Sequence, residues 1–339
     1  MTILVTGASG FVGSFVCEKA LEKGFDTWAG MRSTSSCKYL KDKRLKFAEL
    51  DLGDYEKLRG QLSRYKQHME GKGWDYIVHA AGATKSPDRA GFFRTNTEGT
   101  KNLVRALMAE DMIPRRFVFV SSLSIFGAIR ETPYPYLPIR DEDTPVPNTA
   151  YGESKWKAEQ FLQGLDNFPF VILRPTGIYG PRERDYYIMG KSIKQHIDFA
   201  VGYRPQDLTF VYVDDVVQAV FKSMDAPHAV GKSYFLSDGR VYNSRAFSDL
   251  LQKEMGTSFV LHIKAPLWFL RCVCAVSGTV SRWFGKLSTL NLDKYYILSQ
   301  RNWQCDIEPA RRDLGYEPQV GLAEGVRRSV AWYKQEGWL

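Results

Sequence analysis

The sequence predicts an α/β fold in which helices cover both faces of a parallel sheet. Short apolar runs typical of buried strands alternate with helical patterns through the first half of the 339 residues, and this alternation is typical of parallel sheets. The first run, Ile3 to Val5, is followed at once by Gly7, Gly10 and Gly13 and then by a helical pattern. A glycine-rich turn between a buried strand and a helix is typical of the doubly wound Rossmann sheet.

The elements of this sheet can be placed in chain order. We expect strands near residues 2–6, 26–31, 46–50, 75–79, 116–121 and 169–173. We expect helices near residues 11–23, 55–66, 92–110 and 151–164. The segment from Tyr134 to Asn148 is rich in proline and charge, which predicts a loop leading into the last of these helices.

After Tyr179 the alternation becomes irregular, which predicts a smaller C-terminal substrate-binding domain interleaved with the sheet. A further apolar run at Leu208–Val213, a helix after Asp214 and Asp215, and a strand at Ser233–Leu236 return to the sheet pattern. We therefore expect a dinucleotide-binding domain of residues 1–177 and about 209–236, and a substrate-binding domain of about 178–208 and 237–339.

The glycine-rich loop is a candidate pyrophosphate site. Its glycines permit a tight turn and a close approach of the backbone to a pyrophosphate at the helix N-terminus. Their spacing is GxxGxxG, so an ordinary glycine-rich turn stays open as an alternative, although strand, loop and helix all favour the dinucleotide. The candidate residues of this loop are Gly7, Ser9, Gly10, Phe11, Val12 and Gly13.

Tyr151 and Lys155 are four residues apart within the last predicted helix. Residues at this spacing lie on one helix face, so the ammonium is expected beside the phenol and should favour the phenolate. Bringing a tyrosine from a pKa near 10 to neutral pH takes about 4 kcal/mol. The pair alone could be a solvated surface pair, but together with the glycine-rich loop it indicates a proton-transfer site.

Composition limits the function classes. The net charge is +8, but no basic run is longer than a short pair such as Arg115–Arg116, so solvated surface charge is expected rather than a nucleic-acid site. Five scattered cysteines suggest reduced thiols in the cytoplasm, and they offer no metal site. We expect no signal peptide and no transmembrane segment.

The two motifs together resemble those of the extended short-chain dehydrogenase/reductase superfamily, which contains NAD-dependent epimerases, dehydratases, dihydroflavonol reductases and 3β-hydroxysteroid dehydrogenases. Further stretches match this superfamily in order along nearly the whole chain. They are Asp51–Leu52, His79–Gly82, Asn96–Thr100, Ser121–Ser122, Arg174–Pro181, Val213–Asp215 and Leu314–Pro318.

The resemblance implies roles for particular residues. Tyr151 would be the general acid/base, Lys155 would bind the nicotinamide ribose, and Ser122 would bond the substrate oxygen, with Ser124 as a rival. The implied cofactor contacts are the loop residues above with Asp51, Leu52, Ala80, Ala81, Gly82, Asn96, Tyr151, Lys155, Pro175 and Ile178. The implied substrate-side residues are Thr84, Ser124, Thr176, Gly177 and Tyr179.

Some of these residues have structural alternatives. A structural role for Asp51, as a turn or helix-cap aspartate, is nearly as well supported as a cofactor contact. Asn96 could simply form hydrogen bonds with the backbone. His79 is expected to be a packed strand residue rather than a catalyst.

The second strand favours NADP over NAD. NAD-specific members carry an acidic residue at its end, whereas this chain has Gly30, Met31 and Arg32 there. A guanidinium is able to grip a 2′-phosphate. The alternative is that Arg32 stacks on the adenine or faces solvent.

At two positions this chain lacks residues that particular enzymes of the superfamily carry, and both absences limit the reactions that we expect of it. Leu123 and Ser124 stand where sugar-nucleotide dehydratases carry an acidic pair, and Leu208 or Thr209 stands where epimerases place a pyrophosphate-binding arginine. We therefore expect an NAD(P)-dependent oxidoreductase that transfers hydride at a secondary alcohol or ketone. A sugar-nucleotide epimerase is the main alternative, and a non-catalytic dinucleotide sensor is a weaker one because Ser122, Tyr151 and Lys155 are all present.

Residues 266–286 form an aromatic-rich segment. Read as a helix, it places Arg271, Arg282 and Lys286 in one sector and leaves a broad apolar remainder. We expect its aromatic residues, Trp268 and Phe269 among them, to line an apolar substrate pocket. The alternatives that stay open are a helix packed under the substrate domain, a subunit interface, as in a homodimer, and contact with a membrane surface.

Overall fold

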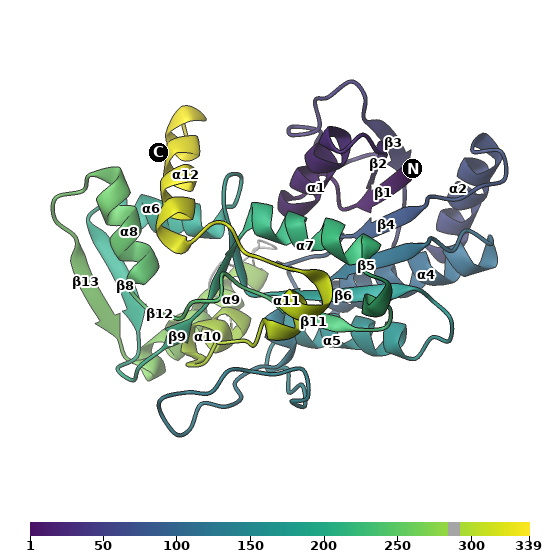
Figure 1. Cartoon of the computed structure of the whole chain (residues 1–339). Coiled ribbons are helices and arrows are strands. Elements are labelled where there is room, and N and C mark those ends of the chain that lie inside the picture. The colour runs from purple at the N-terminus through teal and green to yellow at the C-terminus, as the bar shows by residue number, and fades with distance from the viewer. Residues whose placement is uncertain (284–291) are drawn as a thin grey trace.

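A computed structural model describes residues 1–283 and 292–339. Its centre is a seven-stranded sheet in the order β11-β6-β5-β4-β1-β2-β3, and every neighbouring pair in it is parallel (Figure 1). The order reverses direction at β1, with β2 and β3 on one side and β4, β5 and β6 on the other. The predicted α/β fold with a doubly wound parallel sheet is confirmed.

The strands of this sheet lie close to their predicted positions. They are β1 (Thr2–Thr6), β2 (Asp26–Met31), β3 (Lys46–Glu49), β4 (Tyr76–His79), β5 (Arg116–Val120), β6 (Phe170–Pro175) and β11 (Ser233–Leu236). The helices beside them are α1 (Phe11–Glu22), α2 (Tyr55–His68), α3 (Arg89–Phe92), α4 (Gly99–Ala109), α5 (Ala150–Gln163) and α7 (Val213–Asp225).

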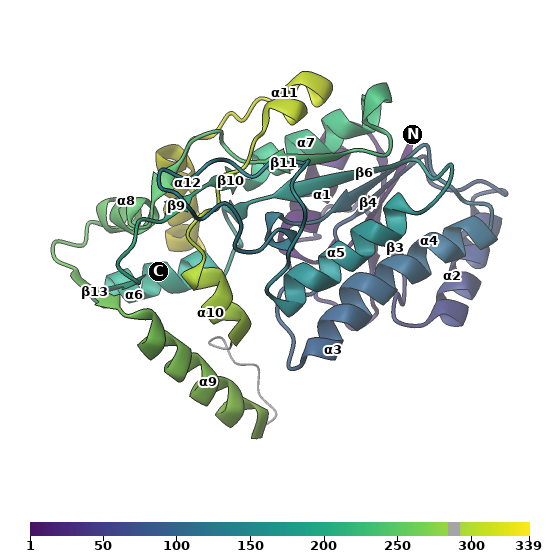
Figure 2. The ribbon, with the colours of Figure 1, turned by 90° about the horizontal axis from the view of Figure 1, so that it is seen from below.

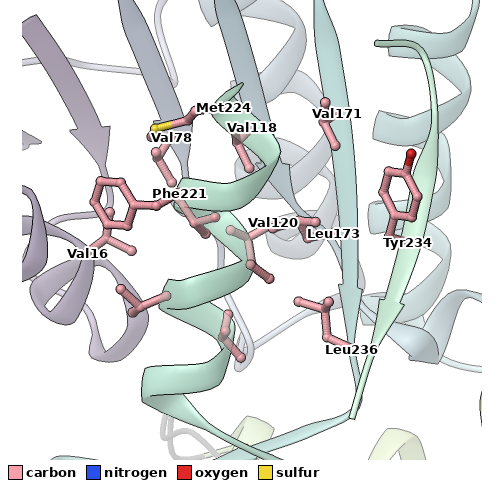
Figure 3. Packing of buried hydrophobic residues seen from close by; sticks show 14 of the residues in the cluster. Val16, Val78, Val118, Val120, Val171, Leu173, Phe221, Met224, Tyr234 and Leu236 are labelled. Carbon is pink, nitrogen blue, oxygen red and sulfur yellow. The ribbon is translucent and has the colours of Figure 1, made fainter. Parts of the chain in front are cut away.

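Two separate cores cover the two faces of the sheet. Because side chains alternate along a strand, Val118 and Val120 of β5 point to one face and Phe117 and Phe119 to the other. Figure 3 shows the first core, where α1 and α7 pack on the strand valines through residues such as Phe221. The second core lies under α2, α4 and α5, the helices grouped together in Figure 2.

The predicted helix at 92–110 is interrupted. A π-helical segment, Phe93–Glu98, separates α3 from α4. It carries two buried polar side chains, of which Asn96 bonds the backbone of Ala83 and Thr97 bonds the carbonyl of Ser154. Wide π turns of this kind are frequent at functional sites, and this one joins the loop after β4 to α5.

The rest of the chain forms small sheets and helices beside the carboxyl ends of the strands. Its strands are β7 (Gly177–Tyr179), β8 (Ile197–Val201), β9 (Asp207–Leu208), β10 (Phe210–Tyr212), β12 (Tyr242–Asn243) and β13 (Leu261–Ala265). Its helices are α6 (Asp185–Lys194), α8 (Ala246–Met255), α9 (Leu267–Trp283), α10 (Leu292–Ser299), α11 (Glu308–Leu314) and α12 (Leu322–Gln335). Two 3₁₀ turns, η2 (Leu123–Ile125) and η3 (Pro227–Ala229), complete the elements.

A third core holds this part together. Tyr179 packs edge to face with Phe210, Tyr212 and Phe247 around the small β7–β10 sheet, and residues of α8 and α12 belong to the same core. Aromatic pairs in this geometry stabilise beyond their buried area. The core therefore fixes β7, and with it the chain segment that leaves the main sheet after Pro175.

Candidate active site

The glycine-rich loop has the shape that a pyrophosphate requires. Gly7 has φ +69°, and a methyl group there would lie 2.6 Å from the backbone of Ala81. The loop therefore packs tightly on the end of β4. Gly10 is the N-cap residue of α1 and has no side chain to bond the first N–H groups of the helix, so these stay available. Free N–H groups at a helix N-terminus bind phosphate oxygens. These residues fit a dinucleotide cofactor.

Tyr151, Ser122 and Lys155 meet at the carboxyl end of β5. Tyr151 lies in the first turn of α5, which Thr149 caps through a bond from the Gly152 N–H. The Tyr151 side chain is half-buried, and its phenol interacts with the hydroxyl of Ser122, which also contacts Ser124 at 3.1 Å. A serine and a tyrosine thus present hydroxyl groups to the same point, where a substrate oxygen could be bound by both.

The lysine does not hold the phenol in the way that the spacing suggests. The Lys155 ammonium donates to the carbonyl of Val120 at 2.8 Å and lies over the ring of Phe119. Burial lowers the pKa of Lys155 to about 8. Burial raises the pKa of Tyr151, while its bond to Ser122 acts in the opposite direction. The free protein therefore keeps a protonated phenol, and the expected depression by Lys155 alone is not seen.

A buried charge network that sequence reasoning missed lies one helical turn beyond Lys155. Glu159 is fully buried and accepts from Arg174 at 2.6 Å and from the hydroxyl of Ser121. Arg174, at the end of β6, also binds Asp141. The Glu159 carboxylate acts against the burial that lowers the pKa of Lys155. The network ties α5 to the ends of β5 and β6 beneath the site.

Asn96 and His79 both have structural partners. The Asn96 amide accepts from the Ala83 N–H at 2.7 Å and donates to Ser154, so it fixes the loop that carries Gly82. A methyl group at Gly82 would lie 3.1 Å from the Lys155 ammonium, so the backbone passes close to that group. His79 is fully buried between the hydroxyls of Thr6 and Thr100, and burial lowers its pKa to about 3.

The adenine end of the expected cofactor site contains one carboxylate and one exposed guanidinium. Asp51 accepts from Lys57 at 2.9 Å and from the Gly53 N–H, which is the turn role considered above. The bond from Lys57 is the main cause that lowers the pKa of Asp51, and the charge of Arg32 adds to it. Arg32 is exposed directly after β2. The backbone of Leu52 accepts from Asn102, which anchors this turn to α4.

Two expected substrate-side residues are not free to meet a substrate. Tyr179 is fully buried within the third core, and Thr176 is buried and bonds Thr209. The expectation of substrate contact is therefore withdrawn for both, because tertiary packing uses their side chains. Thr84 is exposed, Ser124 and Ile178 are half-buried, and Pro175 is buried at the end of β6. Gly177 is half-buried, and the hydroxyl of Tyr186 fills the space that a methyl group there would need.

Two contacts that bridge distant segments also went unforeseen. Asp293 of α10 accepts from the backbone N–H groups of Ala150 and Tyr151, at 3.0 Å for the first. A carboxylate at a helix N-terminus satisfies its free donors and its positive end. Asp185 of α6 likewise joins Lys85, which follows β4, to Lys294 of α10. Nothing local in the sequence pairs positions so far apart.

The aromatic-rich segment does not form the pocket lining that was expected. The region 267–283 is helical, as α9, but Trp268 and Phe269 are exposed at its start. Only Leu270 and Cys274 are buried on the described part of this helix. The end of the segment, including Phe284 and Lys286, lies outside the described residues.

Comparisons with known proteins agree with this geometry. Residues 3–243 match the model of the NAD dependent epimerase/dehydratase family. The chain belongs to this family. It is 26% identical to a UDP-glucose 4-epimerase of Vibrio cholerae, covering 98% of this chain and 96% of that protein. It is 28% identical to a 2-alkyl-3-oxoalkanoate reductase of Stenotrophomonas maltophilia, covering 98% and 99%.

A solved structure gives the same fold. A UDP-glucuronic acid 4-epimerase from Bacillus cereus, in complex with UDP-glucuronic acid and NAD, matches with a TM-score of 0.76 at 21% identity, over 99% of this chain and 100% of that one. Family and relatives together identify an NAD-dependent enzyme of the extended short-chain dehydrogenase/reductase kind. No helix within residues 1–283 and 292–339 is long and apolar enough to span a membrane.

Proposed function

We propose that this enzyme is an NADP-preferring reductase or dehydrogenase that acts on a secondary alcohol or ketone, with Tyr151 as general acid/base. The observation that carries the proposal is the interaction of the Tyr151 phenol with the Ser122 hydroxyl, with Lys155 one helical turn further along α5. The bound nicotinamide cofactor supplies or accepts the hydride. Ser122 and Tyr151 bind the substrate oxygen, and Tyr151 gives that oxygen a proton in reduction or takes one in oxidation.

The lysine completes this role through its remaining donors. An ammonium has three N–H groups, and the bond to Val120 uses one of them. The others are free in principle to bind a ribose hydroxyl and to stabilise a phenolate, as in the superfamily that the chain resembles. The raised pKa of Tyr151 suits a group that begins as an acid, which is the role that ketone reduction requires.

The surroundings of the site support a redox reaction over dehydration. Leu123 is buried, and Ser124 bonds Ser122, so neither residue offers the acid and base that would eliminate water. Of the two residues that could stand at the position of the epimerase arginine, Leu208 has an apolar side chain, and Thr209 is buried and bonded to Thr176 and to the carbonyl of Trp303. Neither side chain carries the charge that would hold a pyrophosphate.

A sugar-nucleotide epimerase is the second candidate, because a UDP-glucose 4-epimerase is among the relatives over the full chain. The two functions differ in their use of cofactor. A reductase consumes NADPH stoichiometrically with a ketone, whereas an epimerase shows no net change in cofactor absorbance.

A panel of ketones, secondary alcohols and UDP-sugars tests the proposal. Steady consumption of NADPH with a ketone, or formation of NADPH with an alcohol, is expected. Conversion of a UDP-sugar to its epimer without net change at 340 nm, and no turnover of any ketone or alcohol, would overturn it.

The preference for NADP rests on Arg32. Its guanidinium is exposed at the end of β2, where a carboxylate that would bond ribose hydroxyls is missing from the strand. An exposed guanidinium can form charge-assisted bonds to a 2′-phosphate. Calorimetric titration with both cofactors tests this, and equal or tighter binding of NAD would contradict it.

A further inference from the structure

The two-stranded sheet of β8 and β13 has an outer face that is apolar. The strands pair in parallel, with Leu261 beside Ile197 and Ile263 beside Phe199. Because side chains alternate, these residues share one face, and the other face turns Asp198 toward Ser248 of α8. On the outer face Phe199 is 61% exposed and Leu261 is 52% exposed. An apolar sheet face is normally packed against another layer of the protein.

Helix α9 continues the same character directly after β13. Leu270 and Cys274 form its buried stripe, one turn apart. Outside that stripe Trp268 is 69% exposed, Phe269 49% and Val276 64%. In Figure 2, α9 extends outward from the region of β13 along the edge of the molecule. We call the exposed side chains of Phe199, Leu261, Trp268, Phe269 and Val276 the apolar surface.

Four of the five side chains of the apolar surface lie in a segment that has no acidic residue. The sequence has no aspartate or glutamate between Met255 and Leu292, in a chain whose net charge is +8. Arg271 of α9 is exposed three residues after Trp268 on the same helix. Lys264 of β13 is also exposed, but by strand alternation it shares the face of His262 and Asp198, opposite Leu261. Large exposed apolar patches mark interaction sites, and the α9 part of this one carries the cation Arg271 without an acid in the same helix.

We propose that the apolar surface docks this enzyme on an anionic membrane surface. Exposed aromatic side chains beside cations are what an interfacial helix needs, since tryptophan prefers the headgroup level and cations bind anionic lipids. A second copy of the chain is a poorer occupant, because a two-fold contact through this surface would bring two α9 segments together, each with Arg271 and neither with an acid to pair with it. The mode is peripheral, as no described helix could span the bilayer.

Co-sedimentation of the full chain with vesicles tests the proposal. Phosphatidylcholine vesicles containing phosphatidylserine should bind the protein, and phosphatidylcholine vesicles alone should bind it much less. Trp268→Ser with Phe269→Ser should weaken binding by about a hundredfold, since two aromatic side chains no longer insert. Arg271→Glu should weaken it by roughly twenty-five-fold, because each charge near an anionic surface contributes about a fivefold change.

Matched controls keep the test specific. Phe47→Ser removes an aromatic side chain of similar exposure, 47%, from β3, and Arg64→Glu reverses an exposed cation on α2. Both should bind vesicles like wild type, and calorimetric cofactor binding shows that each variant is folded. Absence of phosphatidylserine-dependent binding by wild type would overturn the proposal. So would equal loss in the controls, or self-association without vesicles that the double variant abolishes.

Discussion

Replacing Glu159 by glutamine tests the charge network beneath the active site. The carboxylate is fully buried. It accepts hydrogen bonds from Nη2 of Arg174 at 2.6 Å and from Nε of Arg174 at 3.1 Å. Glutamine has nearly the same shape, but it removes the charge and turns one acceptor into a donor. Arg174, itself buried, is then left with Asp141 as its charged partner in the described network.

The expected loss is large. Removing one partner of a buried ion pair costs about 3–5 kcal/mol, because the other charge stays buried. Since Asp141 still binds Arg174, we expect the lower end, about 3 kcal/mol in the free energy of unfolding, measured by urea denaturation. Glu153→Gln on the same helix is the control. Its carboxylate is partly exposed and pairs with Arg89 and Lys157, so the loss should stay below about 1 kcal/mol.

A second readout follows from the position of Lys155. Glu159 raises the pKa of Lys155 against the effect of burial, so the variant should lower that pKa below its value of about 8. The ammonium is then lost at a lower pH, and the alkaline limb of the kcat/KM profile should move toward acid. If Glu159→Gln unfolds no more easily than Glu153→Gln and leaves the profile unchanged, the network does not support the site as argued.

Four further variants, of which Gly24→Ala is a control, probe other parts of the account. Gly7→Ala should weaken cofactor binding by roughly 2–4 kcal/mol in calorimetry. Gly7 has φ +69°, which disfavours alanine, and the added methyl group would clash with the backbone of the loop after β4. Gly24→Ala, with φ +78° and open space, should cost only about 1 kcal/mol of stability and leave cofactor affinity unchanged, and similar affinities in both variants would contradict the steric argument. Arg32→Ala should raise the Kd of NADP by about ten- to a hundredfold and spare NAD, and a parallel loss for both cofactors would refute the 2′-phosphate contact. Asp293→Ala should lower the free energy of unfolding by about 1 kcal/mol and reduce kcat without changing cofactor affinity, whereas an unchanged kcat would limit Asp293 to a structural role.

Much of the fold could be predicted because its signals are local. The apolar run at Ile3–Val5 and the glycines after it need only near neighbours to specify strand, turn and helix. The predicted limits of α5 differ from the observed ones by a single residue at each end. Tyr151 and Lys155 were found in the same way, because helical spacing alone brings them to one face.

The remaining features depend on contacts between distant segments. Tyr179 sits in a motif that the superfamily shares, yet packing against Phe210 and Phe247 removes it from the substrate side. The contact of Asp293 with the start of α5 spans more than a hundred residues of chain, and no periodicity reveals it. The phenol pKa was misjudged because spacing places Lys155 nearby but does not tell where its ammonium points. The ammonium donates a hydrogen bond to the carbonyl of Val120, which lies on β5 and not on the helix of Lys155.

The central claim is that Tyr151 moves the proton, and Tyr151→Phe tests it most directly once a substrate is found in the panel. The variant keeps the ring against Phe92 and loses only the hydroxyl. Single-turnover rates should fall at least about a hundredfold, the lower range for a lost general acid/base, while the Kd of NADP(H) stays unchanged. A variant that binds cofactor normally and turns over at nearly the wild-type rate would contradict the account.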